Sequence, residues 1–250
     1  MASKLSTRKR PDRDVKRTKV ERKLESSVFD QPTMFVLSKL LKKGLITSVD
    51  YPVATGKEAD VFRATCKDGT FFAIKIFRVE TSLFWKMREY LDGDPRFYGI
   101  SSNKLQIILA WTRKEYRNLQ LCHDAGIHVP QPIFADRNVL VMEFLGENGV
   151  PFSTLGQTGS ENPEKDLETI LLDMKKMYEA GFVHSDISEF NILMTDAGPY
   201  IIDVGQGVLL AHPSSQKFLV RDISNILRYF KKCGVRKDEG EVLAYIAGAK

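Results

Sequence analysis

The chain has 250 residues, of which 43% are hydrophobic and 28% are charged, values typical of a soluble globular protein. This length is enough for one large domain or two lobes around a substantial core. No apolar run approaches the roughly 18 residues of a membrane-spanning helix, and the polar, basic N-terminus does not resemble a secretory signal peptide. Three scattered cysteines (Cys66, Cys122 and Cys233) form no CxxC pair, so we expect reduced thiols in a cytoplasmic protein without membrane contact.

The positive charge is concentrated at the N-terminus. Residues 1–25 hold ten Lys and Arg against four Asp and Glu, an excess of six, so the remaining residues sum to −1 within the total of +5. Such a segment has too few apolar side chains to fold alone, and we expect a basic flexible tail. It is either a simple solvated tail or an arm that meets RNA phosphates. Because it has no interleaved aromatic residues, base stacking is not expected.

The first half of the chain predicts one helix followed by strands. A helix over residues 34–43 follows a start signal with a proline and stops at Gly44. The apolar stretches 60–64 and 71–77 are typical of strands, and the turn residues 67–69 lie between them. Residues 81–108 contain several Gly and Pro breakers, so we expect a long, flexible connection with short helical pieces.

The second half is predicted to be mainly helical. A helix over 111–123 and a buried strand over 139–142 precede a segment rich in Gly, Pro and Ser at 147–163, which suits a hinge. Further helices are expected at 164–180, 215–232 and 238–249. We therefore expect an α+β protein with an antiparallel-sheet N-lobe (26–145) and a helical C-lobe (146–250), as in two-lobed nucleotide-binding enzymes.

The most specific pattern lies in the C-lobe. Asp186 sits in a loop between two apolar runs, Asn191 follows five positions later, and Asp203 ends the next apolar run. An aspartate that receives a hydroxyl proton, with an asparagine and a second aspartate that hold magnesium, is the set that phosphoryl transfer needs. We assign His184 a structural role in bracing this loop. The spacing predicts a kinase active site.

A phosphate-binding turn is predicted in the N-lobe at residues 54–62. Gly56 allows backbone N–H groups to approach phosphate, and Lys57 adds charge. The segment is not a Walker loop, because Glu58 stands where Ser or Thr would be required. Taken alone, such a turn is most often only a hairpin turn.

Two further N-lobe features fit the same site. Lys75 in an apolar strand would need a partner charge if it faces inward, and Glu115 on the following helix is the natural partner. The alternative is a Lys75 side chain that points to solvent. At the end of the strand over 139–142, backbone groups of Glu143 and Leu145 would meet the adenine edge with Met142 behind the ring, although the same residues could simply end a core strand.

These motifs together resemble the RIO family of atypical serine/threonine protein kinases. The resemblance rests on Thr55-Gly56-Lys57-Glu58-Ala59, Glu115-Tyr116-Arg117-Asn118-Leu119, His184-Ser185-Asp186-Ile187-Ser188-Glu189-Phe190-Asn191 and Ile202-Asp203-Val204-Gly205-Gln206. The last motif and the Gly-Asp-Pro-Arg-Phe stretch at 93–97 resemble the type-one subfamily. The resemblance covers residues from about 30 to the end, and the small size is similar to a minimal, archaeal-style member.

The resemblance implies a truncated kinase fold with ATP and Mg²⁺ (Mn²⁺ is possible) between the lobes. Catalytic roles fall to Asp186, Asp203 and Lys75, and metal binding to Asn191 and Asp203. The residues assigned to the ATP site are Thr55, Gly56, Lys57, Glu58, Ala59, Val61, Ala73, Lys75, Glu115, Met142, Glu143, Leu145, Glu189, Asn191 and Ile202.

The resemblance also implies an activity and partners. Family members autophosphorylate on a serine in the loop that corresponds to 81–108, here Ser101 or Ser102, and are also described as ATPases that form a phosphoaspartate on the residue equivalent to Asp203. They act in maturation of the small ribosomal subunit, so pre-ribosomal RNA and ribosomal proteins are the expected partners. The oligomeric state, the physiological substrate and the trigger stay open.

Three departures separate the chain from common patterns. Ser185 replaces the Arg of ordinary kinases, and no Ala-Pro-Glu segment follows Asp203, which argues against efficient phosphorylation of other proteins. Gly205 stands where the RIO family usually has Ser. Two alternatives stay open: a small-molecule kinase of the aminoglycoside or choline type, and an assembly factor that uses ATP as a switch with little phosphotransfer. A pure scaffold is the weakest alternative.

Overall fold

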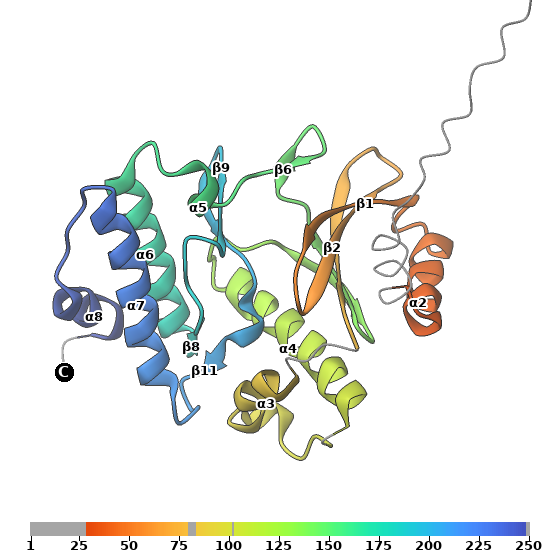
Figure 1. Ribbon diagram of the computed structural model, residues 1–250, viewed down its shortest axis with the longest axis horizontal. Helices are drawn as coiled ribbons and strands as arrows, with labels where there is room; N and C mark the ends of the chain where they lie inside the picture. The colour runs from red at the N-terminus through yellow and green to blue at the C-terminus, as the bar shows by residue number, and fades with distance from the viewer. Residues whose placement is uncertain (1–28, 80–83, 102, 249–250) are drawn as a thin grey trace, which may run out of the picture.

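The computed structural model describes residues 29–79, 84–101 and 103–248. A five-stranded antiparallel sheet forms one end of the molecule, helices α6 to α8 form the other, and α4 crosses between them (Figure 1). The strand order is β1-β2-β3-β5-β4. The strands are β1 (Ser48–Thr55), β2 (Ala59–Thr65), β3 (Phe71–Phe77), β4 (Pro132–Asp136) and β5 (Val139–Glu143). The two-lobed, kinase-like α+β arrangement expected from the sequence is confirmed.

Helix α2 (Gln31–Lys42) covers one face of the sheet. The Asp30 side chain accepts a hydrogen bond from the Thr33 backbone N–H (2.9 Å), which caps the first turn. Val36, Leu37 and Leu40 are buried against apolar side chains of β2, β3 and β5. The expected helix is present: it begins at the predicted start signal, with Asp30 as its N-cap and the proline in the first turn, and it ends at Lys42, one residue before the predicted end.

The opposite face of β3 looks into the cleft. Side chains alternate along a strand, so Ile74 and Ile76, which pack with α2, force Lys75 to the other side. Lys75 is only 8% exposed. The alternative of a solvent-facing Lys75 is therefore wrong, and the sequence could not decide it because every neighbour in the strand is apolar.

The segment between β3 and β4 is more helical than expected. It contains α3 (Phe84–Asp92), the short 3₁₀ turn η1 (Pro95–Phe97) and the 21-residue helix α4 (Lys104–Asp124). The helix predicted at 111–123 begins seven residues earlier, because Asn103 caps it by accepting a hydrogen bond from the Leu105 N–H (2.9 Å). Its buried Ile107 and Ile108 extend the apolar face. Ser102 lies outside the described residues, and Ser101 is exposed just before this cap.

The C-terminal half combines helices with short hairpins. The predicted hinge at 147–163 holds part of the β6–β7 hairpin and the short helix α5, which the sequence did not indicate. The elements are β6 (Gly146–Glu147), β7 (Val150–Pro151), α5 (Leu155–Thr158), α6 (Pro163–Glu179), β8 (Phe182–Val183), β9 (Ile192–Thr195), β10 (Gly198–Ile201), η2 (Val204–Gln206), β11 (Val208–Leu209), α7 (Ser215–Lys232) and α8 (Glu239–Ala247).

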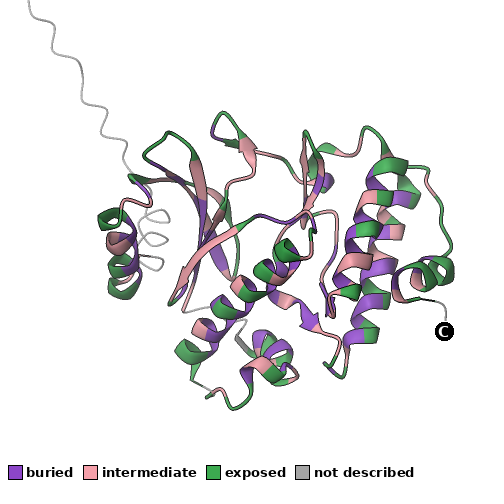
Figure 2. Ribbon diagram, turned by 180° about the vertical axis from the view of Figure 1, so that it is seen from behind, coloured by how far each residue is buried: buried purple, intermediate pink, exposed green. Residues whose placement is uncertain are grey.

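One hydrophobic core joins the two halves. It runs from Ala59 and Phe77 in the sheet, through Trp111 in α4, to Ile226 and Phe230 in α7. Figure 2 shows the buried residues on the inward faces of α4, α6 and α7. Because α4 belongs to this continuous core, its side chains have fixed positions relative to both halves of the molecule. The boundary proposed near residue 145 stays a prediction, and the tail at 1–25 lies outside the described residues.

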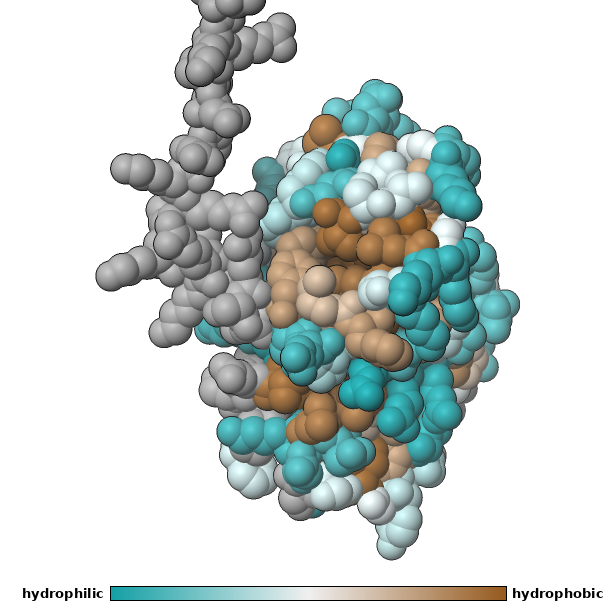
Figure 3. Space-filling model, turned by 90° about the vertical axis from the view of Figure 1, so that its right-hand side faces the viewer, coloured by the Kyte–Doolittle hydropathy of each residue, from teal (hydrophilic) through white to brown (hydrophobic). Residues whose placement is uncertain are grey.

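The end of the molecule that carries α2 shows apolar surface among polar patches (Figure 3). The outer side of α2 leaves Met34, Phe35 and Leu41 exposed. In the part of the chain that the structure describes, no helix combines the length and the apolar character needed to cross a membrane.

Replacing Leu40 should test the packing of α2 on the sheet. Leu40 is fully buried, so Leu40→Ala should lower the free energy of unfolding by about 2–5 kcal/mol, because less apolar surface is buried and a cavity remains. Leu41→Ala is the matched control one residue away, where a side chain that is 43% exposed should change stability by less than about 0.5 kcal/mol. Urea unfolding measures both, and equal decreases would contradict this packing.

Candidate active site

A cavity of about 750 Å³ lies between the sheet and the C-terminal half. Every residue assigned to the ATP site from the sequence lines it except Glu189. Glu189 is half-buried, and its backbone carbonyl accepts a hydrogen bond from the Gly156 N–H (2.8 Å). The lining also includes Ala54, Phe144 and Phe190, which lie within the predicted segments but had no assigned role. The residues that the sequence motifs did not indicate are Val53, Pro130, Pro151, Phe152, Ser153, Thr154, Gln157 and Leu193.

The turn at 56–58 forms the upper edge of this cavity. It connects the antiparallel strands β1 and β2, and the Gly56 N–H donates to the Ala59 carbonyl (2.9 Å). A side-chain carbon on Gly56 would lie 3.2 Å from that carbonyl oxygen, so the tight turn favours glycine. The segment is thus a hairpin turn that also lines the cavity, and its role in binding phosphate stays a prediction.

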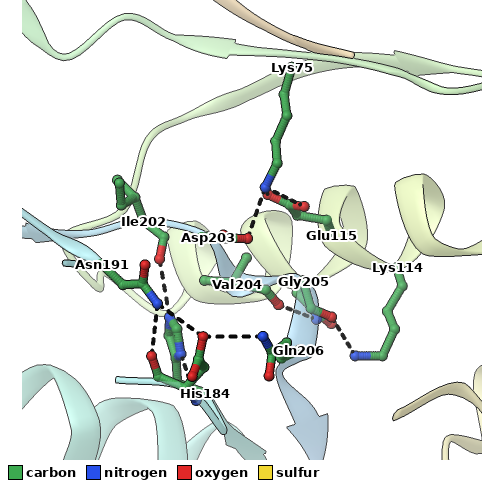
Figure 4. Close-up of polar contacts among 12 residues, drawn as sticks. Lys75, Lys114, Glu115, His184, Asn191, Ile202, Asp203, Val204, Gly205 and Gln206 are labelled. Atoms are coloured by element: carbon green, nitrogen blue, oxygen red, sulfur yellow. Dashed lines mark hydrogen bonds and ion pairs between the residues drawn. The ribbon is translucent and has the colours of Figure 1, made fainter. Parts of the chain in front are cut away.

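Lys75 is held between two carboxylates from different parts of the chain (Figure 4). Its Nζ donates to Glu115 Oε1 (2.7 Å) and Oε2 (2.9 Å) on α4, and to Asp203 Oδ1 (2.8 Å) after β10. Lys75 and Glu115 are buried, whereas the Asp203 side chain is 49% exposed toward the cavity. The ammonium and the Asp203 carboxylate therefore meet where a triphosphate would lie.

The ammonium of Lys75 and the carboxylate of Asp203 each stabilise the ionised form of the other. Burial alone would lower the pKa of Lys75, but the carboxylates of Asp203 and Glu115 more than offset it and raise that pKa above its ordinary value. Burial would raise the pKa of Asp203, yet the Lys75 ammonium holds it below its usual range. For Glu115, burial raises the pKa and the Lys75 ammonium limits the rise. Lys75 and Asp203 are thus ionised at neutral pH and suited to binding an anion and a cation, respectively.

Asn191 lines the same cavity as Lys75 and Asp203, and Asp186 lies directly beside Asn191. Asn191 Nδ2 donates to the Asp186 carbonyl (2.8 Å) and to Asp186 Oδ2 (3.2 Å), and Gln206 Nε2 donates to the same Oδ2 (3.1 Å). Because the amide nitrogen of Asn191 is engaged, its Oδ1 is left to face the cavity. Burial and the Asp203 carboxylate raise the pKa of Asp186, which strengthens it as a proton acceptor.

His184 braces the loop as a neutral ring. Its Nδ1 accepts a hydrogen bond from the Asp186 backbone N–H (3.3 Å), so the proton sits on Nε2, which donates to the Ile202 carbonyl (3.2 Å). Burial lowers the pKa of His184 to about 4. The ring connects the strand before Asp203 to the loop of Asp186, which matches the structural role expected from the sequence.

Asp222 on α7 anchors the same loop, a role that was not apparent from the sequence. Its carboxylate accepts the Ser185 N–H (2.7 Å) and the Ile187 N–H (3.0 Å), while the Arg221 guanidinium donates to the Ser185 carbonyl. Ser185 has φ 70°, a left-handed conformation that costs a non-glycine residue of order 1–3 kcal/mol. The only sequence signal was a carboxylate on the apolar face of a helix.

The turn after Asp203 rests on α4 through Lys114 and Asn118, and the sequence assigned a role to neither. Lys114, fully buried, donates to the carbonyls of Gly205 (2.8 Å) and Gly207, and burial lowers the pKa of Lys114 to about 7. Asn118 Nδ2 donates to the carbonyls of Val204 (2.8 Å) and Gly207 (3.1 Å). These bonds hold the turn that presents Asp203.

The proximity of α4 also accounts for Gly205. A side-chain carbon at this position would lie 3.1 Å from Glu115 Oε2 and 3.2 Å from Trp111 Nε1, closer than ordinary packing allows. A serine at position 205, which the resemblance noted above leads one to expect, would therefore need α4 or the turn to shift by a few tenths of an ångström. This glycine had no explanation from the sequence alone.

The β6–β7 hairpin, which follows the sheet in the chain, is held against the sheet by side chains of β1 and β2. Arg63 stacks between the rings of Tyr51 and Phe71, each 4.5 Å from its guanidinium carbon, and its Nη1 donates to the Gly149 carbonyl (3.0 Å). The Tyr51 hydroxyl donates to the same carbonyl (2.8 Å). The β6–β7 hairpin therefore closes over the outer edge of the cavity beside Glu143, Phe144 and Leu145.

The oxygen atoms of Asp203 and Asn191 are suited to bind a magnesium ion that is also bound by the phosphates of a nucleotide. Asp203 contributes a carboxylate and Asn191 an amide oxygen, both at the cavity wall. Within the described residues no cluster of three or more His, Cys, Asp or Glu side chains could enclose a metal by itself. Magnesium commonly binds through one or two protein ligands plus substrate phosphates and water, so two oxygen donors beside a triphosphate-sized space are sufficient.

Comparisons with known proteins agree with this geometry. A family model described as the RIO domain matches residues 60–242. RIO-type serine/threonine-protein kinase Rio1 of Haloferax volcanii is 39% identical over 251 residues, covering 99% of this chain and 87% of that protein. The protein of the same name from Methanocaldococcus jannaschii is 40% identical over 228 residues, covering 90% and 78%.

A solved structure shares the fold. The Rio2 kinase–ADP/Mg²⁺–phosphoaspartate complex from Chaetomium thermophilum has a TM-score of 0.63 at 21% identity, and the match covers 85% of this chain and 66% of that chain. At this identity the likeness shows the fold alone. The family model and the Rio1 relatives, which match nearly the whole chain, carry the assignment further: the chain belongs to the RIO family of atypical serine/threonine protein kinases.

Proposed function

We propose that the chain binds Mg-ATP in the 750 Å³ cavity and transfers the γ-phosphate either to a serine, by autophosphorylation, or to Asp203, with slow ATP hydrolysis as the result. The observation that carries this proposal is the convergence of Lys75, Asp203 and Asn191 on one cavity wall with Asp186 beside them. The Lys75 ammonium would move from Asp203 to the phosphates when the nucleotide binds.

Both transfers are in-line displacements on the γ-phosphorus. In the first, the serine oxygen forms the new P–O bond, its proton passes to the Asp186 carboxylate, and ADP leaves. In the second, a carboxylate oxygen of Asp203 attacks instead, ADP leaves, and water later cleaves the acyl phosphate. Asn191 and Asp203 would hold Mg²⁺, or Mn²⁺, which supplies charge neutralisation on the phosphate oxygens.

The similarity to Rio1 proteins supports a proposal for the biological setting. Because proteins named Rio1 match nearly the whole chain, we propose a role in maturation of the small ribosomal subunit in the cytoplasm, with ribosomal RNA and ribosomal proteins as partners. The excess of six positive charges in residues 1–25 supports contact with RNA phosphates. Lobes at 26–145 and 146–250 remain part of this proposal.

Two alternatives are separable by experiment. An ATP-dependent switch would bind or hydrolyse ATP without labelling protein, and comparing hydrolysis with phosphate incorporation decides it. A small-molecule kinase of the aminoglycoside or choline type would transfer phosphate to small alcohols. The similar proteins are named serine/threonine-protein kinases, which supports neither alternative.

Labelling with γ-labelled ATP should separate the two transfers. Wild type should carry an acid-stable label on serine and an alkali-labile, hydroxylamine-sensitive label on Asp203. Asp186→Asn should lower the serine label by about 10²–10⁴-fold because the proton acceptor is removed. Asp203→Asn should abolish both labels, since it removes the metal ligand and the acyl acceptor.

Asp196→Asn is the control for this experiment, because Asp196 is an exposed carboxylate in the turn between β9 and β10. It should label as wild type does. A hydroxylamine-sensitive label that persists in Asp203→Asn would place the acyl phosphate on another carboxylate.

The acid limb of the pH–rate profile should report Asp186. Transfer requires the ionised carboxylate, so kcat/KM for serine labelling should rise with pH through the pKa of Asp186, which burial and Asp203 place above that of an exposed aspartate. Gln206→Leu removes a donor to the carboxylate and should move the limb to higher pH. Gln216→Leu, an exposed position on α7, should not move it, and an unmoved limb in Gln206→Leu would disprove the assignment.

Deleting residues 1–25 should reduce the salt dependence of RNA binding. The slope of log K against log salt should become shallower by about 0.7–0.9 for each RNA phosphate that the protein no longer neutralises. Filter binding of the full chain and the deletion to one RNA at several salt concentrations measures the slope. An unchanged slope would mean that the tail is only solvated.

A further inference from the structure

A second cavity, of about 330 Å³, lies against Asp186 on the side away from the nucleotide cavity. Asp186 lines this cavity and does not line the first, whereas Glu58 lines both. Glu58 thus marks the boundary between the two spaces. The second cavity is therefore a space from which an acceptor group can reach Asp186 without displacing the nucleotide, and we name it the acceptor cavity. It is lined by Glu58, Lys86, Met87, Glu89, Tyr90, Trp111, Asp186 and Gln206.

Helix α3 forms the outer wall of the acceptor cavity, with Lys86 and Glu89 among its exposed lining residues. The helix is fixed in place by Met87 and Leu91, which are buried, and by Tyr90, whose ring packs 6.2 Å from Trp111 and 5.4 Å from Phe218. The wall is therefore a packed element of the fold that presents side chains to a bound chain.

The acceptor cavity is acidic. Its lining has three carboxylates, on Glu58, Glu89 and Asp186, against one ammonium, on Lys86. Arg221 adds a second positive charge beside Asp186 and Tyr90, so three carboxylates face two cations and the balance stays negative by one. Arg88 is paired with Asp92 (3.1 Å). A bound ATP would add further negative charge beside Glu58. A positively charged acceptor is favoured by this field and an acidic one is disfavoured.

The segment after Asp203 is too short to form a docking surface for a polypeptide acceptor, so α3 is the element that can form one. Following η2, the chain pairs β11 with β8 and enters α7 at Ser215, so little chain is available there to dock a polypeptide. The wall opposite Asp186 comes instead from α3 and the turn that holds Glu58.

We propose that the acceptor cavity takes a serine or threonine of a polypeptide segment whose flanking residues are lysine or arginine, with Glu89 and Glu58 contacting the flanking cations. The chain itself carries such a segment at residues 3–11, where Ser6 and Thr7 precede Arg8, Lys9 and Arg10. This inference rests on the proposed function and adds the class of acceptor. The serine oxygen attacks the γ-phosphorus, Asp186 takes the proton, and ADP leaves.

The test compares two synthetic peptides as acceptors for the full chain with γ-labelled ATP. One has the sequence of residues 3–11, and in the other every Lys and Arg is replaced by Glu. The readout is the ratio of kcat/KM for the basic peptide to that for the acidic one. Because the ratio is internal to each variant, a change in overall turnover cancels. Wild type should prefer the basic peptide by at least about tenfold.

Charge changes on α3 should move this ratio in opposite directions. Glu89→Lys should lower the ratio severalfold and Lys86→Glu should raise it, since both side chains are exposed and line the acceptor cavity. Glu179→Lys, an exposed change of the same charge on α6, is the control and should leave the ratio as in wild type. A wild-type ratio near one, or a ratio that neither α3 variant shifts, overturns the proposal.

Two other outcomes are distinguishable. If the full chain hydrolyses ATP or labels Asp203 but transfers nothing to either peptide, the acceptor assignment is wrong and the phosphotransfer function stands. If it neither hydrolyses ATP nor transfers phosphate, the proposed function is wrong, and the acceptor assignment, which rests on it, is wrong as well.

Discussion

The contact of Lys75 with Glu115 and Asp203 is the interaction on which the site depends. It joins the sheet, α4 and the turn after β10 within 2.7–2.9 Å. A buried ammonium is costly unless it is paired, so each partner fixes the others, and removing one would leave an uncompensated charge in the interior. The distance between the two halves of the cleft is set by this pairing together with the core through Trp111.

Helix α4 carries the constraint to both sides. Glu115 holds Lys75, while Lys114 and Asn118 hold the carbonyls of the turn that follows Asp203. Asn118 in turn accepts a hydrogen bond from Arg96 (2.8 Å), and Arg96 forms a two-point ion pair with Asp94. Arg96 and Asp94, which follow α3, are therefore connected through Asn118 on α4 to the turn that carries Asp203. Each of these buried polar groups needs its partner, so the contacts support one another.

The sequence identified the parts of the site that depend on local spacing. Asp186, Asn191 and Asp203 lie in short motifs whose geometry is set by a loop and a strand end. The direction of Lys75 could not be derived, because it depends on Ile74 and Ile76 packing with α2. Asp222 and Lys114 were missed for the same kind of reason: their functions arise from backbone groups far away in the sequence. Glu189 was assigned to the ATP site on family resemblance, yet its side chain does not line the cavity.

Gln206 connects the residues that line the two cavities. It lies three residues after Asp203 and donates to Asp186, so the turn that would bind metal also holds the proton acceptor. Val204, between them, is fully buried, and Asn118 bonds its carbonyl, which leaves the turn little freedom to move in part. A displacement of Asp203 when Lys75 moves to a phosphate would therefore shift Asp186 as well. The proposed nucleotide site and the proposed acceptor cavity therefore share one turn, which holds Asp203 at one end and contacts Asp186 through Gln206 at the other.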